Sequence, residues 1–254
     1  MNLSPVQLSY EEHGSGTPLV LLHGFPLNRS IWKPLIPLLS DTARLILPDL
    51  RGHGQSPAPE GTYTMREMAE DVYQLLNRLG LDRVVLGGHS MGGYVALAFA
   101  QAYPKRLAGL ALIASHPAAD TLEKRQSRLV QARQVRSRGQ AKLASQMPAA
   151  LTPNPVVAAQ VSDMILANPK QGIVGALLGM AEREDTTRAL ASIQVPALVV
   201  AGSEDRIVSP ETAAEFIGFF PRGWMVEAPG AGHLPMMETP EIVAAALRDL
   251  IRRA

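Results

Sequence analysis

Ser90 has the surroundings that a nucleophilic serine needs. It is the middle residue of the run GHSMG, which follows a short apolar run and precedes a helical pattern. A sharp turn between a strand and a helix exposes the serine hydroxyl, and Gly88 and Gly92 avoid a collision of side chains across that turn. The backbone N–H of Met91, the first of the helix, would then face a developing oxyanion. We therefore expect Ser90 to be the nucleophile of an acyl-transfer reaction.

A serine nucleophile needs a general base, and the chain has six histidines. His233 lies in the run GAGHLP, between the last expected strand and the last expected helix. This position is at the same edge of the sheet as Ser90. His89 adjoins Ser90 but would point away from it, and the other four histidines lie in turns or at the start of the helical middle stretch. We expect His233 to be the general base.

A carboxylate must orient the base and stabilise its protonated form. Asp205 lies in the run GSED, just after an apolar run, and precedes His233 in the chain. Glu204 is its nearest rival, and Asp120, which follows the preceding expected strand, is a second rival. The chain order of serine, aspartate and then histidine favours Asp205.

A second donor to an oxyanion is expected in the loop HGFP, residues 23–26, which follows an apolar run. Gly24 lets the backbone turn sharply, so that the N–H of Phe25 can face the serine. The sequence thus predicts an oxyanion hole made by the backbone N–H groups of Phe25 and Met91.

Seven short apolar runs are expected to be strands. They are Val6–Glu11, Leu19–Leu22, Arg44–Leu47, Val84–Leu86, Leu107–Ile113, Ala197–Ala201 and Trp224–Glu227. Helices are expected at Thr64–Leu79, Met91–Tyr103 and Pro240–Arg252. Continuous apolar runs indicate strands that are buried on both faces. The alternation predicts an α/β fold with a mostly parallel twisted sheet that is flanked by helices.

Five motifs in this order resemble α/β-hydrolase-fold serine hydrolases of the carboxylesterase and enol-lactonase branch: HGFP, DLRGHGQS, GHSMGG, GSEDRIV and GAGHLPMMETP. The resemblance implies a catalytic triad of Ser90, Asp205 and His233 and an oxyanion hole at Phe25 and Met91. It implies a structural role for the DLRGHGQS loop. Epoxide hydrolases and haloalkane dehalogenases of this fold have a nucleophilic aspartate where this chain has serine. Meta-cleavage C–C hydrolases often have asparagine at the position before the serine.

Residues 116–185 break the alternation of strands and helices. They indicate about four helices, and a helical insertion in such a sheet usually covers the ligand crevice. We expect an α/β-hydrolase core at residues 1–115 and 186–254. We expect residues 116–185 to be an all-helical cap, inserted after the sixth strand.

The pocket under this cap is expected to be modest, apolar and aliphatic. Met147 and Met180 of the cap are candidate lining residues, because methionine adapts its shape to varied ligands. His89 and Leu234 are candidates from the core.

Seven basic residues and no acidic residue lie from Lys124 to Lys142. We expect a solvated helix face. Its apolar side would pack on the core through Leu122, Leu129, Ala132 and Val135. The alternatives are attraction of anionic substrates, such as an oxo-acid lactone, and contact with an acidic surface. Arg183 and Asp185, where the cap returns to the core, are expected to form an ion pair.

The composition excludes several classes of function. The 254 residues include 24 basic and 23 acidic side chains, a net charge of +1 that gives no indication of nucleic-acid binding. The absence of cysteine excludes disulfides, a cysteine nucleophile and thiolate metal sites. No apolar run approaches the roughly 20 residues that span a bilayer. No basic residue precedes Arg29, so we expect a cytoplasmic protein without a signal peptide. A monomer is the default, with a homo-oligomer as the alternative.

These residues together predict a serine hydrolase that cleaves carboxylic esters with short to medium acyl chains through an acyl-enzyme. The expected partner is a small-molecule ester or lactone, and no metal ion or organic cofactor is expected. Enol-lactonase, other lactonase and cofactor-free perhydrolase activity are alternatives on the same site. A ligand receptor with slow turnover is a third interpretation.

Overall fold

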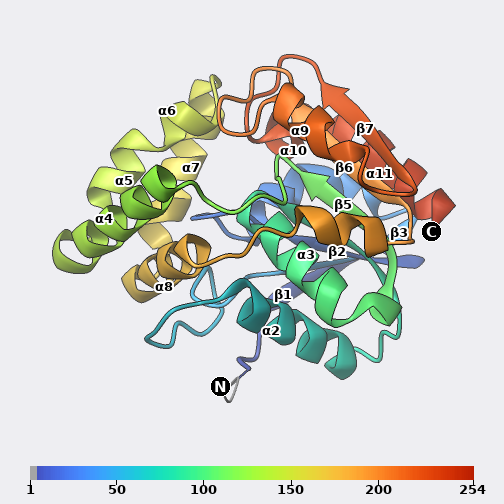
Figure 1. The fold of residues 1–254 in the computed structure, drawn as a ribbon, viewed down its shortest axis with the longest axis horizontal. Coiled ribbons are helices and arrows are strands. Elements are labelled where there is room, and N and C mark those ends of the chain that lie inside the picture. Colours follow the sequence, from blue (N-terminus) through green and yellow to red (C-terminus); the bar gives the residue numbers. More distant parts are fainter. Residues whose placement is uncertain (1–4) are drawn as a thin grey trace.

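A sheet of seven strands organises residues 5–254, the part of the chain that the computed structural model describes (Figure 1). The strands are β1 (Tyr10–His13), β2 (Thr17–Leu22), β3 (Ala43–Pro48), β4 (Val84–His89), β5 (Leu107–Ile113), β6 (Ala197–Gly202) and β7 (Gly223–Ala228). Their order is β1-β3-β2-β4-β5-β6-β7. The pair β1–β3 is antiparallel and the other five pairs are parallel. Every residue of β4 and β6 is buried, as continuous apolar runs predict.

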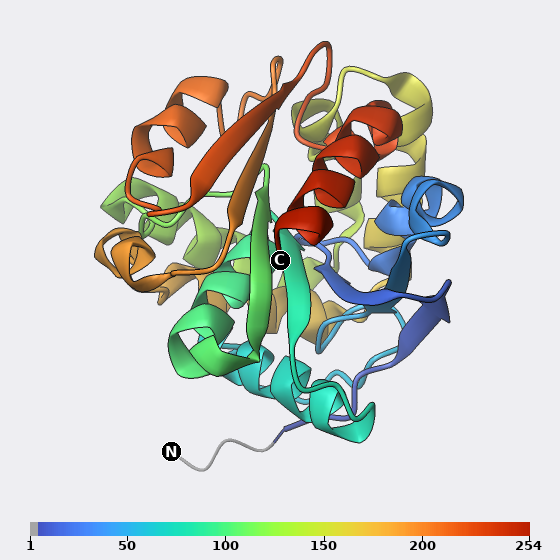
Figure 2. The same cartoon turned by 90° about the vertical axis from the view of Figure 1, so that its right-hand side faces the viewer.

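Helices cover both faces of the sheet. They are η1 (Arg29–Leu35), α1 (Ile36–Leu39), α2 (Met65–Arg78), α3 (Met91–Ala102), η2 (Pro104–Arg106), η3 (Thr187–Ser192), α9 (Pro210–Ile217), α10 (Pro235–Glu238) and α11 (Pro240–Arg253). Figures 1 and 2 show α2, α3 and α9 on one face and η1, α1 and α11 on the other. The predicted α/β fold, with a mostly parallel sheet flanked by helices, is confirmed. The chain order reverses between β2 and β4, and such a switch point is where ligands bind in open sheets of this kind.

The helical insertion follows β5, the fifth strand of the described residues, so its predicted place after the sixth strand is wrong. The expected first strand, Val6–Glu11, is also displaced, because β1 begins only at Tyr10. The amides of Val6 and Ser9 donate to the side chains of Asp71 and Ser56, at 2.8 and 2.9 Å, instead of pairing with a strand. No additional strand therefore precedes β1 within the described residues.

The insertion contains five helices where the sequence indicates about four. They are α4 (Leu122–Arg138), α5 (Ala141–Gln146), α6 (Pro148–Leu151), α7 (Pro155–Ala167) and α8 (Lys170–Ala181). Pro148 separates α5 from α6, because proline has no N–H for a hydrogen bond within a continuing helix. Figure 1 shows these helices grouped beside one end of the sheet. The division into a core and a cap stays a prediction, and residues 1–4 of the predicted core lie outside the described residues.

The two ends of the insertion meet. Both the backbone N–H and the side-chain hydroxyl of Thr186 donate to the carbonyl oxygen of Pro117, each at 3.0 Å. A second tie runs through Asn168, whose Nδ2 donates to the carbonyl of Pro26 at 2.7 Å. The side-chain oxygen of Asn168 accepts from the N–H of Gly54 at 2.7 Å. The insertion is thus attached at its ends and also to two loops of the sheet.

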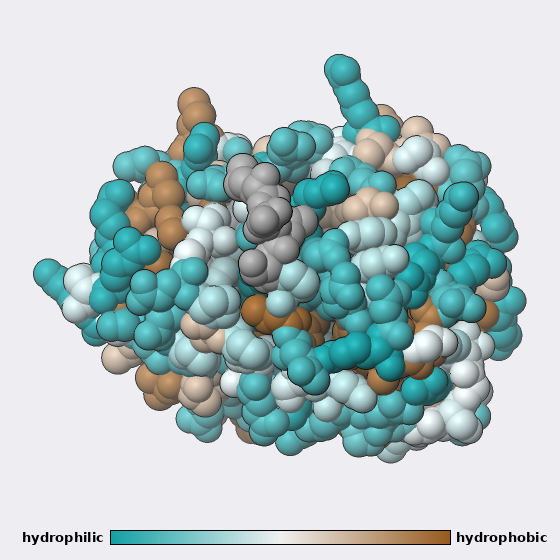
Figure 3. Space-filling model, turned by 90° about the horizontal axis from the view of Figure 1, so that it is seen from below, coloured by the Kyte–Doolittle hydropathy of each residue, from teal (hydrophilic) through white to brown (hydrophobic). Residues whose placement is uncertain are grey.

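Some large hydrophobic side chains are exposed on the inserted helices, including Leu122, Val156 and Leu166. Leu122 is 86% exposed, so the expectation that it packs on the core is wrong, whereas Ala132 and Val135 are buried. The face in Figure 3 shows hydrophobic residues only in small patches among hydrophilic ones. Among residues 5–254, none of the helices has the length and apolar character that crossing a membrane requires.

Candidate active site

Ser90 occupies the turn between β4 and α3 in an unusual backbone conformation. Its φ is +50° and its ψ is −113°, in the region that residues other than glycine rarely adopt. Its N–H donates to the carbonyl of Ile113 at 3.0 Å. Its carbonyl accepts from the N–H of Gly93 at 2.9 Å and from the hydroxyl of Ser115 at 2.8 Å. These bonds hold a strained turn that presents the serine side chain, and such strain is typical of functional sites.

Two glycines allow neighbouring segments to approach this turn. A Cβ on Gly92 would lie 2.3 Å from the carbonyl oxygen of Leu22, so only glycine lets α3 start against the end of β2. A Cβ on Gly24 would lie 2.4 Å from Nδ1 of His89 and 3.0 Å from Cβ of Ser90. The loop HGFP therefore lies directly against the serine turn.

The two predicted partners of Ser90 converge on it from the loops after β6 and β7. Nε2 of His233 lies 3.0 Å from Oγ of Ser90, and Nδ1 of His233 lies 2.7 Å from Oδ2 of Asp205. His233 is 2% exposed and Asp205 is 4% exposed. The rivals lie elsewhere: Glu204 is exposed, and Asp120 is paired with arginines as described below.

Asp205 has a fixed orientation. Its Oδ1 accepts from the backbone N–H groups of Ile207 and Val208, at 2.8 and 3.1 Å. Oδ2 is then directed to His233. A carboxylate there accepts a hydrogen bond from Nδ1–H and so keeps the proton on Nδ1, which leaves Nε2 without a proton and able to accept one from the hydroxyl of Ser90.

The backbone of His233 is held at both of its polar groups. Its N–H donates to the carbonyl of Leu151 on α6 at 2.8 Å, and its carbonyl lies 2.8 Å from Nε2 of His89. Burial, and then the nearby His233, lower the pKa of His89 well below its usual range. The ring is therefore neutral, and it donates from Nε2 to that carbonyl. His89 is a positioning residue in this geometry.

Phe25 and Met91 lie where backbone donors could face a reacting carbonyl. Met91 is the first residue of α3, so its N–H has no carbonyl partner within the helix. Gly24 brings Phe25 next to the serine turn, and the Phe25 side chain lines the cavity. Their role as an oxyanion hole stays a prediction.

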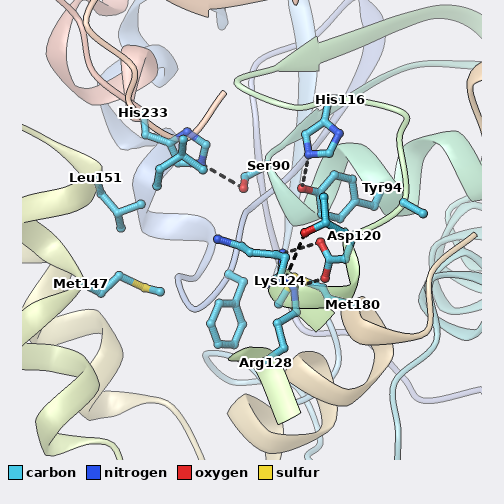
Figure 4. Close-up of a pocket in the computed structure, with 14 residues that line it drawn as sticks. Ser90, Tyr94, His116, Asp120, Lys124, Arg128, Met147, Leu151, Met180 and His233 are labelled. Atoms are coloured by element: carbon cyan, nitrogen blue, oxygen red, sulfur yellow. Dashed lines mark hydrogen bonds and ion pairs between the residues drawn. The ribbon is translucent and has the colours of Figure 1, made fainter. Parts of the chain in front are cut away.

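A cavity of about 320 Å³ opens in front of Ser90 and His233 (Figure 4). Met147 and Met180 line it, whereas His89 and Leu234 do not and are fully buried. Its apolar wall is completed by Phe25, Ala119, Leu151 and Ile207, and its polar wall consists of Tyr94, His116, Asp120, Thr121, Lys124 and Arg128. Within residues 5–254, no three His, Cys, Asp or Glu side chains are grouped so that they could hold a metal ion.

Sequence reasoning missed the polar wall, although a signal exists. Lys124 and Arg128 are spaced by four residues in the first turns of α4, and this spacing places their side chains on one side of the helix, while Asp120 lies two residues before the helix begins. Lys124 is exposed, as expected of a solvated helix face, but it also lines the cavity, and Arg128 is half-buried beside it, so the expectation is wrong for Arg128.

Asp120 is the centre of an ion-pair cluster in this wall. Nε and Nη2 of Arg128 lie 2.5 and 3.3 Å from its carboxylate oxygens, and Arg183 also donates to it. The guanidinium of Arg183 lies 4.1 Å from the centre of the Tyr94 ring. The predicted pair of Arg183 with Asp185 is wrong, because the Asp185 carboxylate instead accepts from the N–H of Thr187 at 2.8 Å.

Replacing Asp120 by asparagine is expected to lower the free energy of unfolding by about 3 kcal/mol at pH 7, because Arg183, 3% exposed, would keep a buried charge without a carboxylate. Burial alone would raise the pKa of Asp120, but Arg128 and Arg183 outweigh it and hold that pKa below its usual range. A depressed folded-state pKa contributes stability above the unfolded pKa, and this stability is lost as the pH falls through the folded one. Urea unfolding should therefore show a difference between wild type and variant that shrinks in acid. Asp163→Asn, at an exposed position on α7, is the control and should change stability by less than about 0.5 kcal/mol.

Comparisons with known proteins agree with this architecture. A family model described as alpha/beta hydrolase fold matches residues 17–240. The dihydrolipoyllysine-residue acetyltransferase component of the acetoin cleaving system from Pseudomonas putida is 32% identical over 244 residues. This match covers 94% of this chain but only 64% of that protein.

Two solved structures are similar over nearly their whole length. A thermophilic esterase from Thermogutta terrifontis, solved with malate bound, has a TM-score of 0.94 and 42% identity, over 97% of this chain and 93% of that chain. The enol-lactonase from Burkholderia xenovorans LB400 has a TM-score of 0.90 and 26% identity, over 97% of each chain. This chain therefore belongs to the alpha/beta hydrolase fold family and is a hydrolase of that fold.

Proposed function

We propose that this protein is a serine hydrolase that cleaves carboxylic esters with short to medium acyl chains through an acyl-enzyme intermediate. The observation that carries this proposal is the continuous series of contacts from the carboxylate of Asp205 through His233 to Oγ of Ser90, at 2.7 and 3.0 Å. The similarity to the Thermogutta esterase supports the ester as substrate.

The proposed first step is acylation. Nε2 of His233 takes the hydroxyl proton of Ser90 as Oγ attacks the ester carbonyl. The N–H groups of Phe25 and Met91 stabilise the oxyanion, and Asp205 stabilises the protonated imidazole. Nε2 then protonates the departing alcohol as the tetrahedral intermediate collapses to an acyl-enzyme.

The second step is deacylation by water. His233 takes a proton from a water molecule that attacks the acyl carbon, and it returns that proton to Oγ of Ser90 as the acid leaves. The hydrogen bonds of the His233 backbone, from its N–H to the Leu151 carbonyl and from the His89 ring to its carbonyl, fix its position through both steps. We further propose that residues 116–185 act as a cap, because α4, α6 and α8 supply side chains to the cavity wall.

Lactone hydrolysis is a second candidate, favoured by the similarity to the Burkholderia enol-lactonase. It needs the same attack and the same proton transfers, but the leaving alcohol stays attached to the acyl group. Perhydrolysis and slow-turnover ligand binding remain weaker predictions from the sequence.

The size of the cavity predicts the preferred acyl chain. A volume near 320 Å³ is at the small end of ligand sites, which span about 300 to 1,000 Å³. With p-nitrophenyl esters from C2 to C12, we expect kcat/KM to peak at about C4 to C6, because each buried methylene contributes about 0.8 kcal/mol only until the cavity is filled. A decline of about tenfold or more is expected by C12.

Release of p-nitrophenolate measures this series, and a fluorophosphonate that labels Ser90 measures the fraction of active sites. Equal kcat/KM values from C4 to C12 would show that the cavity does not limit the acyl chain. Labelling without turnover of any ester or lactone would contradict the proposed function.

A further inference from the structure

The polar wall of the cavity carries more positive than negative charge. Arg128 and Arg183 both bind the carboxylate of Asp120, so one anion already faces two guanidinium groups. Lys124, one turn before Arg128 on α4, is a third cation near this carboxylate. Of the three cations, Lys124 and Arg128 line the cavity and Arg183 does not. These four side chains together have a net charge of +2, three cations and one carboxylate.

Lys124 is the cation of this wall that remains available. Within residues 5–254, its ammonium group has no hydrogen-bond or ion-pair partner, and only its backbone N–H is bonded, to the hydroxyl of Thr121. Figure 4 shows its side chain pointing into the cavity, toward the side on which Ser90 lies. Arg128 is less available, because its Nε and Nη2 are committed to Asp120.

Lys124 is exposed, but two features of its surroundings disfavour a cation at this position. Lys124 is in the first turn of α4, where the helix dipole favours negative and disfavours positive side chains. Burial, and then the charge of Arg128, lower its pKa. Each of these unfavourable effects would be offset by an anion bound in front of the ammonium group.

We propose that Lys124 is a specificity-determining residue that binds a carboxylate of the substrate, so that the site takes esters or lactones carrying a second, anionic group. The inference rests on the proposed function and deepens it. The cavity then has two ends. The polar wall receives the carboxylate, and the apolar wall with Met147, Leu151 and Met180 receives the alkyl part.

Two pairs of isosteric esters test this subsite. Monoethyl adipate and ethyl 6-methylheptanoate differ only in a terminal carboxylate or isopropyl group on the acyl side. The acetate ester of 4-hydroxybutanoate and 4-methylpentyl acetate differ in the same way on the alcohol side. For each pair, the readout is the ratio of kcat/KM for the anionic ester to kcat/KM for its neutral partner, and the two pairs show which side carries the charge.

Lys124→Met is expected to lower this ratio about tenfold for at least one pair, as the loss of one charge-assisted hydrogen bond predicts. Lys124→Glu should lower it further, and added salt should lower the wild-type ratio but not that of the methionine variant. Lys142→Met is the matched control, because Lys142 belongs to the same basic run but does not line this cavity. It should leave both ratios within twofold of wild type.

The role of Lys124 would be overturned if wild type and Lys124→Met gave equal ratios of kcat/KM, anionic to neutral ester, for both pairs. If the neutral esters were hydrolysed in that case, the esterase proposal would still stand. If neither member of either pair were hydrolysed, the proposed function would fail, and the subsite with it. A dicarboxylate product gives an independent readout: adipate should inhibit wild type competitively, with an inhibition constant about tenfold lower than for Lys124→Met.

Discussion

Ser90→Ala is expected to lower kcat/KM for the preferred ester by at least about 10⁴-fold, because catalysis would retain only binding and the oxyanion donors. Oγ is the atom that His233 contacts, and the bonds that hold the turn use the backbone of Ser90. Alanine also keeps a Cβ at the same positive φ, so the strain of the turn does not change. The free energy of unfolding should therefore stay within about 1 kcal/mol of wild type.

Steady-state hydrolysis measures the loss of kcat/KM, and thermal unfolding measures the stability of the variant. Mass spectrometry after fluorophosphonate treatment shows whether the protein is labelled. The variant should fold, fail to turn over and remain unlabelled. Ser145→Ala, at an exposed serine of α5, should retain full activity and labelling. A stoichiometric label on Ser90→Ala protein would place the nucleophile at another residue.

Asp205→Asn is expected to lower kcat by about 10³- to 10⁴-fold while the fold is kept. The amides of Ile207 and Val208 donate to Oδ1, so an asparagine is expected to place its oxygen there and its NH₂ group where Oδ2 meets His233. The imidazole must then accept at Nδ1 and carry its proton on Nε2. A donor facing Oγ of Ser90 cannot take the serine proton.

Glu204→Gln is the matched control for this change. Glu204 adjoins Asp205 but is exposed, so its replacement should change kcat by less than about twofold. A larger loss in Glu204→Gln than in Asp205→Asn would reverse the assignment of the carboxylate. Thermal unfolding of both variants separates a chemical effect from a loss of structure.

Most of the strands and the turn that position the site can be predicted from local sequence. Apolar runs predicted six of the seven strands closely and the first only in part, and the serine between a strand and a helix predicted the turn at Ser90. These features depend on neighbours in the chain. The convergence of Ser90, Asp205 and His233 follows from parallel topology, since each side chain comes after the carboxyl end of a strand. The order of the elements was therefore enough to bring three distant residues together.

The polar wall could not be predicted in the same way. Whether Lys124 faces solvent or a cavity depends on how α4 is rotated on the sheet, and tertiary packing decides this rotation. Arg183 has an acidic neighbour two residues away, but the buried carboxylate of Asp120 lies 63 residues earlier in the chain. His89 was expected in the pocket wall, yet its ring lies beneath His233, where it bonds a backbone carbonyl.

The hydrogen bond from His233 to Leu151 has a consequence for chimeric proteins. The ends of the insertion meet at Pro117 and Thr186, which suggests a module that could be exchanged between relatives without moving the sheet. However, a graft that joined correctly at these two points would still have to place a backbone carbonyl where that of Leu151 accepts from the N–H of His233. Recombination of new specificities onto this scaffold therefore has to preserve, besides the two covalent junctions, the carbonyl at residue 151 and the bonds of Asn168 to two loops of the sheet.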